Sequence, residues 1–465
     1  MGLIVTLDLG TSYYKAAAFG PEGELLAVHR EVPPVAHPRP GWWELEAEVF
    51  RATVGRAMAG LAAALPGGLG EVDALSFATQ TNSFLLLDDR DQPITPIILW
   101  PDSRAVGLAG LDELLSPPDL RGTTGLPAMT YEFLPAKLAW LREHDADVWC
   151  RAARLCLLSD YLTWWLTGRH VTGASVAGLT GLVDIHRLQW WPRACERVGV
   201  PAWWLPEIVR MGTETGRLRP EAAAELGLPA RCHFVVGCLD QYAGAIGLGN
   251  VAEGGVSETT GTVLASVRCA HRFSEHLPAE VFQGPGFQAG VYYQMVFGSA
   301  SANLLEWYRN QLPDCPSFEE LDRLAAEVKP GAGGLRVQGG IRMQSVEEVF
   351  GCVPDDPGRA VRAIMEAVAR VLAGQVAALC GQDRPAEIRS GGGAARSRLW
   401  LQIKADLLDV PFAAPVCPEP TSLGAAMIGR HVLGGVSWVT LARHWVRMRE
   451  VCKPDARHAE MYRAG

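Results

Sequence analysis

Residues Leu3–Phe19, "LIVTLDLGTSYYKAAAF", give the pattern from which the fold can be inferred. An apolar run is followed by an acidic residue, a small turn of Gly, Thr and Ser, and a second apolar run. Short apolar runs on either side of such a turn are typical of a β-hairpin. We therefore predict a buried strand over residues 3–7, a turn, and a returning strand over residues 15–19.

A similar arrangement recurs about halfway along the chain. Residues 256–267, "VSETTGTVLASV", again combine a strand pattern, an acidic residue, a Thr/Gly turn and a second strand pattern. Since 465 residues exceed one ordinary core, we expect more than one domain. The recurrence favours a duplicated two-domain architecture with a nucleotide between the halves. Two unrelated Gly/Thr hairpins remain the alternative.

The segments around these hairpins alternate between helical and extended patterns. Helices are predicted over residues 44–65, 157–168, from 358 and after 393, and strands over 72–79, 83–89 and 387–390. The tail, residues 438–465, is polar, and we predict that it is helical and lies across a domain surface.

The amino-acid composition excludes several classes of protein. A hydrophobic fraction of 48% and a charged fraction of 20% are typical of a folded globular protein. The net charge of −9 gives no basic field for nucleic acid. The eleven cysteines form no CxxC pair, which favours reduced thiols over a disulfide framework. With no signal peptide and no stretch of membrane length, we expect a cytoplasmic protein without a membrane partner.

The first motif that carries chemistry is "DLGTSYYK", residues 8–15. Successive backbone N–H groups in a Gly/Thr turn can line an anion site. The hydroxyls of Thr11 and Ser12 and the charge of Lys15 can add to it. Asp8, at the strand end, can hold a hydrated Mg²⁺, which prefers carboxylate and water oxygens. The alternative is an ordinary hairpin with a solvated aspartate.

A second motif, "SGGGAARSRLW", begins at Ser390. Gly391, Gly392 and Gly393 precede a predicted helix and allow a phosphate or a flat ligand to approach the backbone closely. The alternative is a flexible connection between a strand and a helix. No Gly-Lys-Ser/Thr follows, so this is not a Walker P-loop.

A third motif covers residues 79–105, "TQTNSFLLLDDRDQPITPIILWPDSRA". A polyol site needs hydrogen-bonding groups and an aromatic face, and this stretch offers both, from Gln80, Thr81, Asn82, Trp100, Asp102 and Arg104. A surface hairpin with an Arg–Asp pair is the alternative. The chain contains no HExxH, EF-hand loop or zinc-spaced Cys/His cluster.

Taken in order, these motifs resemble those of the FGGY family of carbohydrate kinases, in the actin–Hsp70–hexokinase superfamily. The further segments that carry the resemblance are "DYLTWWLTGRHVTGASVAGLTGLVDI" from Asp160, "GCLDQYAGAIGLG" from Gly237, "ETTGT" from Glu258 and "PEPTSLGAAMIG" from Pro418. The resemblance implies an α/β fold of two ribonuclease H-like (actin-like ATPase) domains with a central cleft. Residues 1–247 would form the sugar-binding domain and residues 248–465 the ATP-binding domain.

The resemblance also implies a reaction, the transfer of the γ-phosphoryl group of Mg-ATP to a hydroxyl of a pentulose-type sugar, D-xylulose first. Asp240 would be the general base, and Asp8 would be catalytic through Mg²⁺. The implied ATP contacts are Thr11, Ser12, Lys15, Thr260, Gly261, Thr262, Gly391, Gly392 and Gly393. The implied sugar contacts are Thr81, Asn82, Trp100, Asp102, Arg104 and Gln241. Thr81 and Asn82 stand where xylulokinases carry a Met-His pair, so the sequence departs from that pattern at the sugar site.

Several alternatives stay open at this point. Another acceptor, such as glycerol, L-ribulose, L-fuculose or gluconate, would suit the same family. An actin-like nucleotide switch or a catalytically silent sugar sensor would share the superfamily fold. The expected partner is a small sugar or polyol and not nucleic acid, and a homodimer is compatible with the resemblance.

Overall fold

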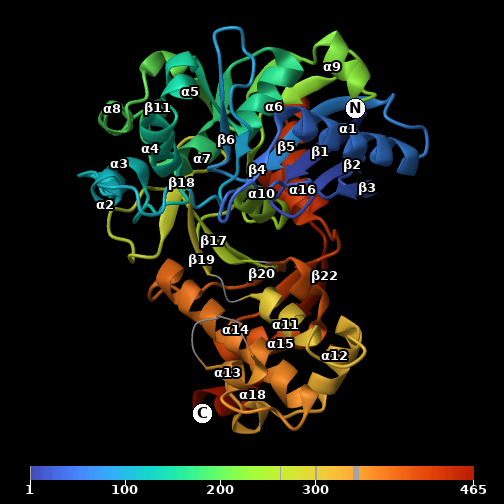
Figure 1. Cartoon of the computed structure of the whole chain (residues 1–465). Coiled ribbons are helices and arrows are strands. Elements are labelled where there is room, and N and C mark those ends of the chain that lie inside the picture. Colours follow the sequence, from blue (N-terminus) through green and yellow to red (C-terminus); the bar gives the residue numbers. More distant parts are fainter. Residues whose placement is uncertain (1, 262, 299–300, 339–344, 465) are drawn as a thin grey trace.

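The computed structural model describes residues 2–261, 263–298, 301–338 and 345–464. In this part of the chain, each half contains a seven-stranded mixed sheet with helices packed against it (Figure 1). The first half is blue to green in Figure 1, and the second is mainly yellow to red. Thr262, which the resemblance implies as an ATP contact, lies outside the described residues.

The first sheet has the predicted hairpin near its centre. Its order is β13 (Glu214–Arg217), β14 (His233–Val235), β5 (Val72–Thr79), β1 (Leu3–Leu9), β2 (Tyr14–Phe19) and β3 (Leu25–Glu31), and β15 (Cys238–Leu239) also pairs with β5. β1 runs antiparallel to β2, with Asp8 opposite Lys15, and parallel to β5. The hairpin prediction is therefore confirmed, and the strand predicted over residues 72–79 has those bounds.

The second sheet repeats this arrangement. Its order is β18 (Phe282–Pro285), β19 (Tyr292–Gly298), β17 (Leu264–Ala270), β16 (Val256–Thr260), β20 (Ile388–Gly391), β21 (Phe412–Pro415) and β22 (Met448–Cys452). β16 runs antiparallel to β17 and parallel to β20, as β1 does with β2 and β5. The shared strand order agrees with the duplication that the sequence suggests.

The predicted helices form where apolar residues recur at helical spacing. α1 (Ala47–Ala64) packs on β2 and β3, and α6 (Leu158–Thr167) ends at Gly168, which adopts a left-handed conformation with φ of 78°. α14 (Pro357–Cys380) is the described helix whose length and apolar composition would allow it to cross a membrane. Most of that apolar window is buried, so α14 is the core helix of the second half.

One helix from the second half of the sequence lies against the first sheet. α16 (Pro420–Gly434) packs on β1, on β5 and on α10 (Asp240–Gly247), and Figure 1 shows it in red among the blue strands. Its companion α15 (Arg398–Leu408) stays with the second sheet and packs on α14. The two halves are thus joined by a direct crossing of α10 and α16.

The C-terminal tail departs from its prediction. After α17 (Trp438–Trp445) comes β22, which pairs with β21, before α18 (Ala456–Ala464) ends the described chain. The prediction of a helical tail is therefore wrong at residues 448–452, where alternating exposed and more buried residues form an edge strand.

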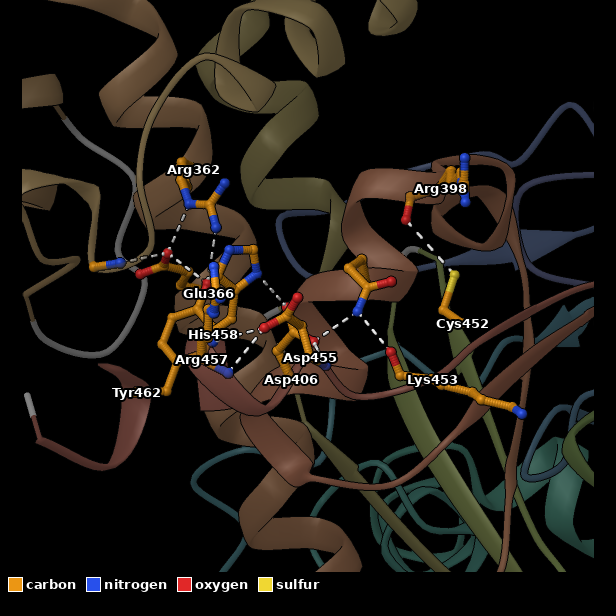
Figure 2. A network of polar contacts seen from close by, with 12 residues as sticks. Arg362, Glu366, Arg398, Asp406, Cys452, Lys453, Asp455, Arg457, His458 and Tyr462 are labelled. Atoms are coloured by element: carbon orange, nitrogen blue, oxygen red, sulfur yellow. Dashed lines mark hydrogen bonds and ion pairs between the residues drawn. The ribbon is translucent and has the colours of Figure 1, made fainter. Parts of the chain in front are cut away.

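Polar contacts fasten this tail to the second half, as Figure 2 shows. The Tyr462 hydroxyl donates to Glu366 of α14 over 2.9 Å, and the His458 ring Nδ1 lies 3.0 Å from the Asp406 carboxylate of α15. Arg362 completes the cluster through a 3.0 Å ion pair with Glu366.

The remaining elements build the outer layers of both halves. A smaller, four-stranded sheet has the order β4 (Glu44–Leu45), β7 (Ile97–Ile98), β6 (Phe84–Leu87) and β8 (Arg154–Leu157). Further pairs join β9 (Val171–Gly173) to β12 (Glu207–Val209) and β10 (Val183–Asp184) to β11 (Gln189–Trp190). The other helices are α2 (Leu111–Leu115), α3 (Leu120–Thr124), α4 (Leu134–His144), α5 (Ala146–Arg151), α7 (Ala174–Ala177), α8 (Pro192–Val198), α9 (Pro220–Glu225), α11 (Ala302–Arg309), α12 (Phe318–Ala326) and α13 (Val346–Phe350).

Candidate active site

The predicted catalytic residues leave the first sheet from one edge. β1, β5 and β15 are parallel, and their last residues, Leu9, Thr79 and Leu239, lie in register. Asp240 follows the end of β15 directly, and Asp8 is one residue before the end of β1. In open α/β sheets, ligands bind outside the carboxyl ends of the strands. The topology therefore brings the two carboxylates, predicted from motifs far apart in sequence, to the same edge.

Asp240 is the first residue of α10 and remains partly exposed. Its Oδ1 accepts a hydrogen bond from the backbone N–H of Gln241 at 2.7 Å. Burial of the carboxyl raises its pKa to about 7, and the negative charge of Asp8 adds to this shift, while the Gln241 N–H and Lys15 oppose it. A carboxyl with this pKa can take up a proton near neutral pH, as a general base must.

Asp8 belongs to a chain of charged groups that extends into the second half of the sequence. Lys15 Nζ lies 3.1 Å from Asp8 Oδ2 and 3.1 Å from Glu419 Oε2, and Arg30 pairs with the same Glu419. Burial raises the pKa of Asp8, and Lys15 counteracts it. Burial alone would lower the pKa of Lys15, but the carboxylates of Asp8 and Glu419 raise it above its usual value. Lys15 is therefore a fixed positive charge at this edge.

The turn that holds Thr11 and Ser12 is in direct contact with the sugar-side segment, residues 79–105. The indole Nε1 of Trp100 donates to Thr11 Oγ1 at 2.8 Å, and the backbone N–H of Trp100 donates to Ser83 Oγ at 2.9 Å. Ser12, the next residue of the turn, is exposed. Trp100 therefore couples the position of the turn to that of the segment predicted to hold the sugar.

The six predicted sugar contacts fall into two groups of different exposure. Thr81, Trp100 and Gln241 are partly exposed, whereas Asn82, Asp102 and Arg104 are buried. The Thr81 hydroxyl donates to the carbonyl of Val176 at 2.9 Å. A hydroxyl that donates to the protein can still accept a hydrogen bond from a ligand.

In the buried group, Asn82 has a backbone partner for each end of its amide. Its Nδ2 donates to the Leu179 carbonyl at 3.2 Å, and its Oδ1 accepts from the Leu134 N–H at 2.9 Å. Its backbone adopts a left-handed conformation with φ of 60°, which asparagine tolerates better than most residues. These bonds hold the turn that follows β5.

Asp102 and Arg104 form a buried pair. Arg104 Nε donates to Asp102 Oδ1 at 2.8 Å, and its Nη2 donates to Glu44 at 2.6 Å. The guanidinium also lies 3.9 Å from the centre of the Trp42 ring. The remaining Asp102 oxygen accepts from the N–H of Trp43 at 2.7 Å. Both side chains are therefore already bonded to other residues of the protein.

Lys137 is a residue of this site that the sequence analysis missed. It is fully buried on α4, and its Nζ donates to the carbonyls of Asn82, Leu99 and Trp100 at 2.9, 3.2 and 3.2 Å. Burial lowers its pKa to about 7, with Asp102 opposing that shift. A single lysine within "LPAKLAWL" was the available signal, although it does not say which carbonyls the ammonium would reach.

The second half brings the other two predicted motifs together. β16 and β20 are parallel, with Thr259 opposite Gly391, so both loops leave the second sheet at one edge. Gly392 has φ of +79°, and a Cβ there would lie 2.6 Å from the Thr260 carbonyl oxygen. Only glycine fits this approach. The Thr260 side chain itself is fully buried, so Thr260 can meet a ligand through its backbone alone.

These nucleotide-motif loops also lie against the helix that begins at Asp240. A Cβ on Gly391 would lie 3.2 Å from the Leu248 side chain, and one on Gly244 would lie 3.9 Å from Thr259 Oγ1. Gly393 opens a short 3-10 turn, and Gly261 accepts from Ser301 Oγ at 2.7 Å. The crossing of α10 and α16 is therefore where the motifs of both halves meet.

A cavity of about 250 Å³ lies beside the glycine loop. Its lining residues are Gly391, Gly392, Ala395, Arg396, Pro415, Val416, Cys417, Pro418, Pro420 and Arg449. Arg449 is held by a 2.9 Å hydrogen bond from its Nη2 to the Ala395 carbonyl. Small and apolar walls with a few polar groups suit a flat heterocycle.

The acidic residues at this edge suit a hydrated magnesium ion better than a protein-caged metal. Among the described residues, no group of three or more His, Cys, Asp or Glu side chains is arranged to hold a metal. Asp8 has one carboxylate oxygen paired with Lys15 and a second one to offer. Mg²⁺ usually keeps several waters and takes one or two carboxylates plus substrate phosphates, so this donor set fits.

Comparison with known proteins agrees with the motifs. Residues 3–247 match the N-terminal domain of the FGGY family of carbohydrate kinases, and residues 256–432 match the C-terminal domain. A glycerol kinase of Dechloromonas aromatica (strain RCB) is 30% identical, over 93% of this chain and 89% of that protein. A xylulose kinase of Lactococcus lactis subsp. lactis (strain IL1403) is 28% identical, over 72% of this chain and 66% of that protein.

The fold has close counterparts among solved structures. The ligand-bound xylulose kinase from Lactobacillus acidophilus superposes with a TM-score of 0.88 at 20% identity, covering 100% of this chain and 96% of that one. This likeness confirms the predicted two-domain α/β fold of the actin-like ATPase type. With both family domains matched in order, the chain belongs to the FGGY family of carbohydrate kinases.

Proposed function

We propose that this carbohydrate kinase transfers the γ-phosphoryl group of Mg-ATP to a hydroxyl of a pentulose, with D-xylulose as the first candidate. The observation that carries the proposal is the placement of Asp240, with its pKa near 7, at the sheet edge beside Asp8 and Lys15. A base poised near neutral pH next to an anion-binding turn is what phosphoryl transfer to a hydroxyl needs.

In the proposed reaction, the Asp240 carboxylate accepts the proton of the sugar hydroxyl. The hydroxyl oxygen forms a bond to the γ-phosphorus, and the bond from that phosphorus to the bridging oxygen breaks, which releases ADP. Such a transition state is loose, so positioning and charge stabilisation supply most of the catalysis. Magnesium, when bound, would neutralise charge that builds up on the phosphates.

On the nucleotide side, FGGY kinases use ATP as the phosphate donor. We propose that the turn at Thr11 and Ser12, together with Lys15, contacts the transferring phosphates and that Asp8 holds the hydrated magnesium. From the second half, the turn at Thr260, Gly261 and Thr262 would add backbone donors. Gly391, Gly392 and Gly393 would lie against the adenosine, with the neighbouring 250 Å³ cavity as its pocket.

On the sugar side, exposure decides the roles that we propose. Thr81, Trp100 and Gln241 are partly exposed and would touch the acceptor directly. Asn82, Asp102 and Arg104 are buried and already bonded to the protein, so they would orient the sugar-side segment instead. Lys137 would support the same segment from beneath.

Glycerol is the second candidate acceptor. The glycerol kinase relative is 30% identical over 93% of this chain, whereas the xylulose kinase relative is 28% identical over 72%. L-Ribulose, L-fuculose and gluconate remain further options for the same site. A coupled ADP-release screen over ketopentoses, ketohexoses, glycerol and aldonates tests the choice. The proposal requires D-xylulose to give the highest kcat/KM, and a higher value with glycerol would replace it.

The same proposal assigns residues 1–247 to sugar binding and residues 248–465 to ATP binding. It places the enzyme in the cytoplasm, where ATP and soluble sugars are available. A homodimer is the assembly that we propose, and light scattering on the purified protein tests it. Sugar-independent ATP turnover with filament assembly would instead favour an actin-like switch.

The pH dependence follows from the state in which Asp240 works. A base must be ionised to accept a proton, and its pKa is raised to about 7. We expect kcat/KM for the sugar to fall about tenfold per pH unit below 7 and to level off above it. Initial rates measured from pH 5 to 9 check this. An acid limb near pH 4, the range of an ordinary carboxyl group, would contradict it.

Asp8→Asn is expected to raise the Mg²⁺ concentration needed for half-maximal activity by about tenfold. The amide keeps the shape of the side chain but removes the charge that would attract the hydrated ion. Mg²⁺ titration in the ADP-release assay measures this shift, and the KM for the sugar serves as the internal control. An unchanged Mg²⁺ requirement would remove Asp8 from the proposed metal site.

A further inference from the structure

A buried ion pair lies directly beneath the two nucleotide-motif loops. Lys404 of α15 and Glu258 of β16 have fully buried side chains, and Lys404 Nζ lies 2.7 Å from Glu258 Oε1. Glu258 opens the "ETTGT" segment but lies within β16, before the turn that follows Thr260, and Lys404 lies on α15. Lys404 and Glu258 are therefore a buried polar centre of the second half to which the proposed reaction assigns no role.

Hydrogen bonds connect this pair to both loops. Lys404 Nζ donates to Thr260 Oγ1 at 2.9 Å, and Thr260 Oγ1 in turn donates to Glu258 Oε2 at 2.6 Å. The hydroxyl of Ser390, just before the glycines, donates to Glu258 Oε1 and lies 3.5 Å from Lys404 Nζ. Thr260 ends β16 and Ser390 lies in β20, so the pair joins the bases of both loops.

The backbones above the pair are also in contact. A Cβ on Gly392 would lie 2.6 Å from the Thr260 carbonyl oxygen, so the glycine loop lies tightly against the end of β16. The Thr260 hydroxyl both donates and accepts within the core, which fixes its rotamer and with it the end of β16. A change in this hydroxyl's partners would therefore be transmitted to both loops.

Stability alone gives little reason for such a pair. Apolar residues of similar volume are often as stable as a buried ion pair or more so, because two desolvated charges are costly. What an apolar pair cannot do is hold two hydroxyls in fixed directions. The geometry thus favours a role in positioning over a role in core packing.

We propose that Glu258 and Lys404 are positioning residues that set the turn after β16 and the glycine loop at the spacing that ATP needs. The inference rests on the proposed nucleotide role of those loops. Neither residue touches ATP itself, since both are buried beneath the loops. Their loss should weaken ATP use and leave the sugar site, which lies on the first half, unchanged.

The decisive variant is the double substitution Glu258→Leu with Lys404→Met. It removes both charges together, so neither is left buried and unpaired, whereas Lys404→Met alone is expected to fold poorly. We expect the double variant to keep a cooperative thermal unfolding transition. Its KM for ATP should rise about tenfold, with the KM for the sugar within about twofold of the parent value. A folded double variant with an unchanged KM for ATP would overturn the inference.

A milder variant keeps the proposal testable if the double variant does not fold. Ser390→Ala leaves the ion pair intact and removes its link to β20. It should raise the KM for ATP in the same direction by about threefold, again without changing the KM for the sugar. No change in the KM for ATP would count against the inference.

Two controls separate the possible failures. Arg362→Met with Glu366→Leu removes another buried ion pair from the second half, on α14, and should leave the KM for ATP unchanged. An equal rise in the KM for ATP of that control variant would show that any loss of a buried ion pair from this core has the same effect, and it would overturn the inference. Gly392→Ala tests the loops themselves and should raise the KM for ATP. If it does not, the proposed nucleotide role fails and the inference with it. If Gly392→Ala raises the KM for ATP but the Glu258/Lys404 and Ser390 variants do not, the inference fails and the proposed nucleotide role of the loops stands.

Discussion

Asp240→Asn is expected to lower kcat/KM for the sugar by about 10³-fold, because the amide cannot accept the hydroxyl proton. The substitution preserves the size of the side chain, and the backbone N–H of Gln241 can still donate to the remaining oxygen. KM values should therefore change little, and the loss should lie in kcat. Steady-state ADP release measures it, and turnover within tenfold of the parent would remove Asp240 from the role of base.

The same variant should also change how stability depends on pH. Folding raises the pKa of the Asp240 carboxyl to about 7, so between pH 4 and 7 the folded state holds a proton that the unfolded state has lost. The folded state therefore loses stability as pH rises through that window. Asn cannot ionise, so Asp240→Asn should melt at a higher temperature than the parent at pH 8, with a smaller difference at pH 5. An equal difference at both pH values would contradict this.

Asp160 offers a matched control for Asp240, the proposed base. It is a buried carboxyl in the first turn of α6, its pKa is also raised by burial to about 7, and it accepts from the Leu157 N–H at 3.0 Å. Asp160→Asn should affect stability but leave kcat of the folded enzyme unchanged. A comparable loss of kcat in both variants would show that a buried carboxyl as such, and not its place at the sheet edge, is what the enzyme requires.

The sequence was most informative where the interactions are local. The hairpin at Asp8 to Lys15 and the strand from Val72 to Thr79 were predicted because turn residues and apolar runs lie next to each other in the chain. The edge strand β22 was missed because it is defined by pairing with β21, more than thirty residues earlier, and not by its own composition. Local pattern therefore predicted the sheet centre better than its edge.

The candidate site shows the same limit. Its two aspartates could be selected from motifs, but the contact of Lys15 with Glu419 joins residues about 400 positions apart and depends on how α16 crosses the first half. Likewise, the sequence placed Asn82 and Arg104 among the sugar contacts because of their chemistry. Their burial and existing partners emerge only once the chain has folded around them. Tertiary packing, which a motif does not encode, separates the partly exposed residues that we propose as sugar contacts from the buried ones that we propose orient the segment.

Gly424→Ala is expected to destabilise the enzyme by about 3 kcal/mol or more, because the crossing of α10 and α16 has no room for a methyl group. A Cβ on Gly424 would lie 1.8 Å from the Ala243 carbonyl oxygen, and one on Gly247 would lie 1.8 Å from the Pro420 carbonyl oxygen. These neighbours are backbone atoms, so no flexible side chain can move aside. The helices must separate instead. Such a separation would shift Asp240, the first residue of α10, and Glu419, which directly precedes α16.

The matched control for this crossing is Gly374→Ala, in the exposed face of α14, where a new Cβ would meet no atom within 4 Å. Alanine is the better helix former, so this variant should gain about 0.5 to 1 kcal/mol. Thermal and denaturant unfolding of both variants, with kcat measured on the folded fraction, tests the pair. Equal stability changes would show that the glycines of the crossing act through helix propensity alone. A loss confined to Gly424→Ala, with reduced kcat, would show that close backbone contact between the halves holds Asp240, the proposed base, in place.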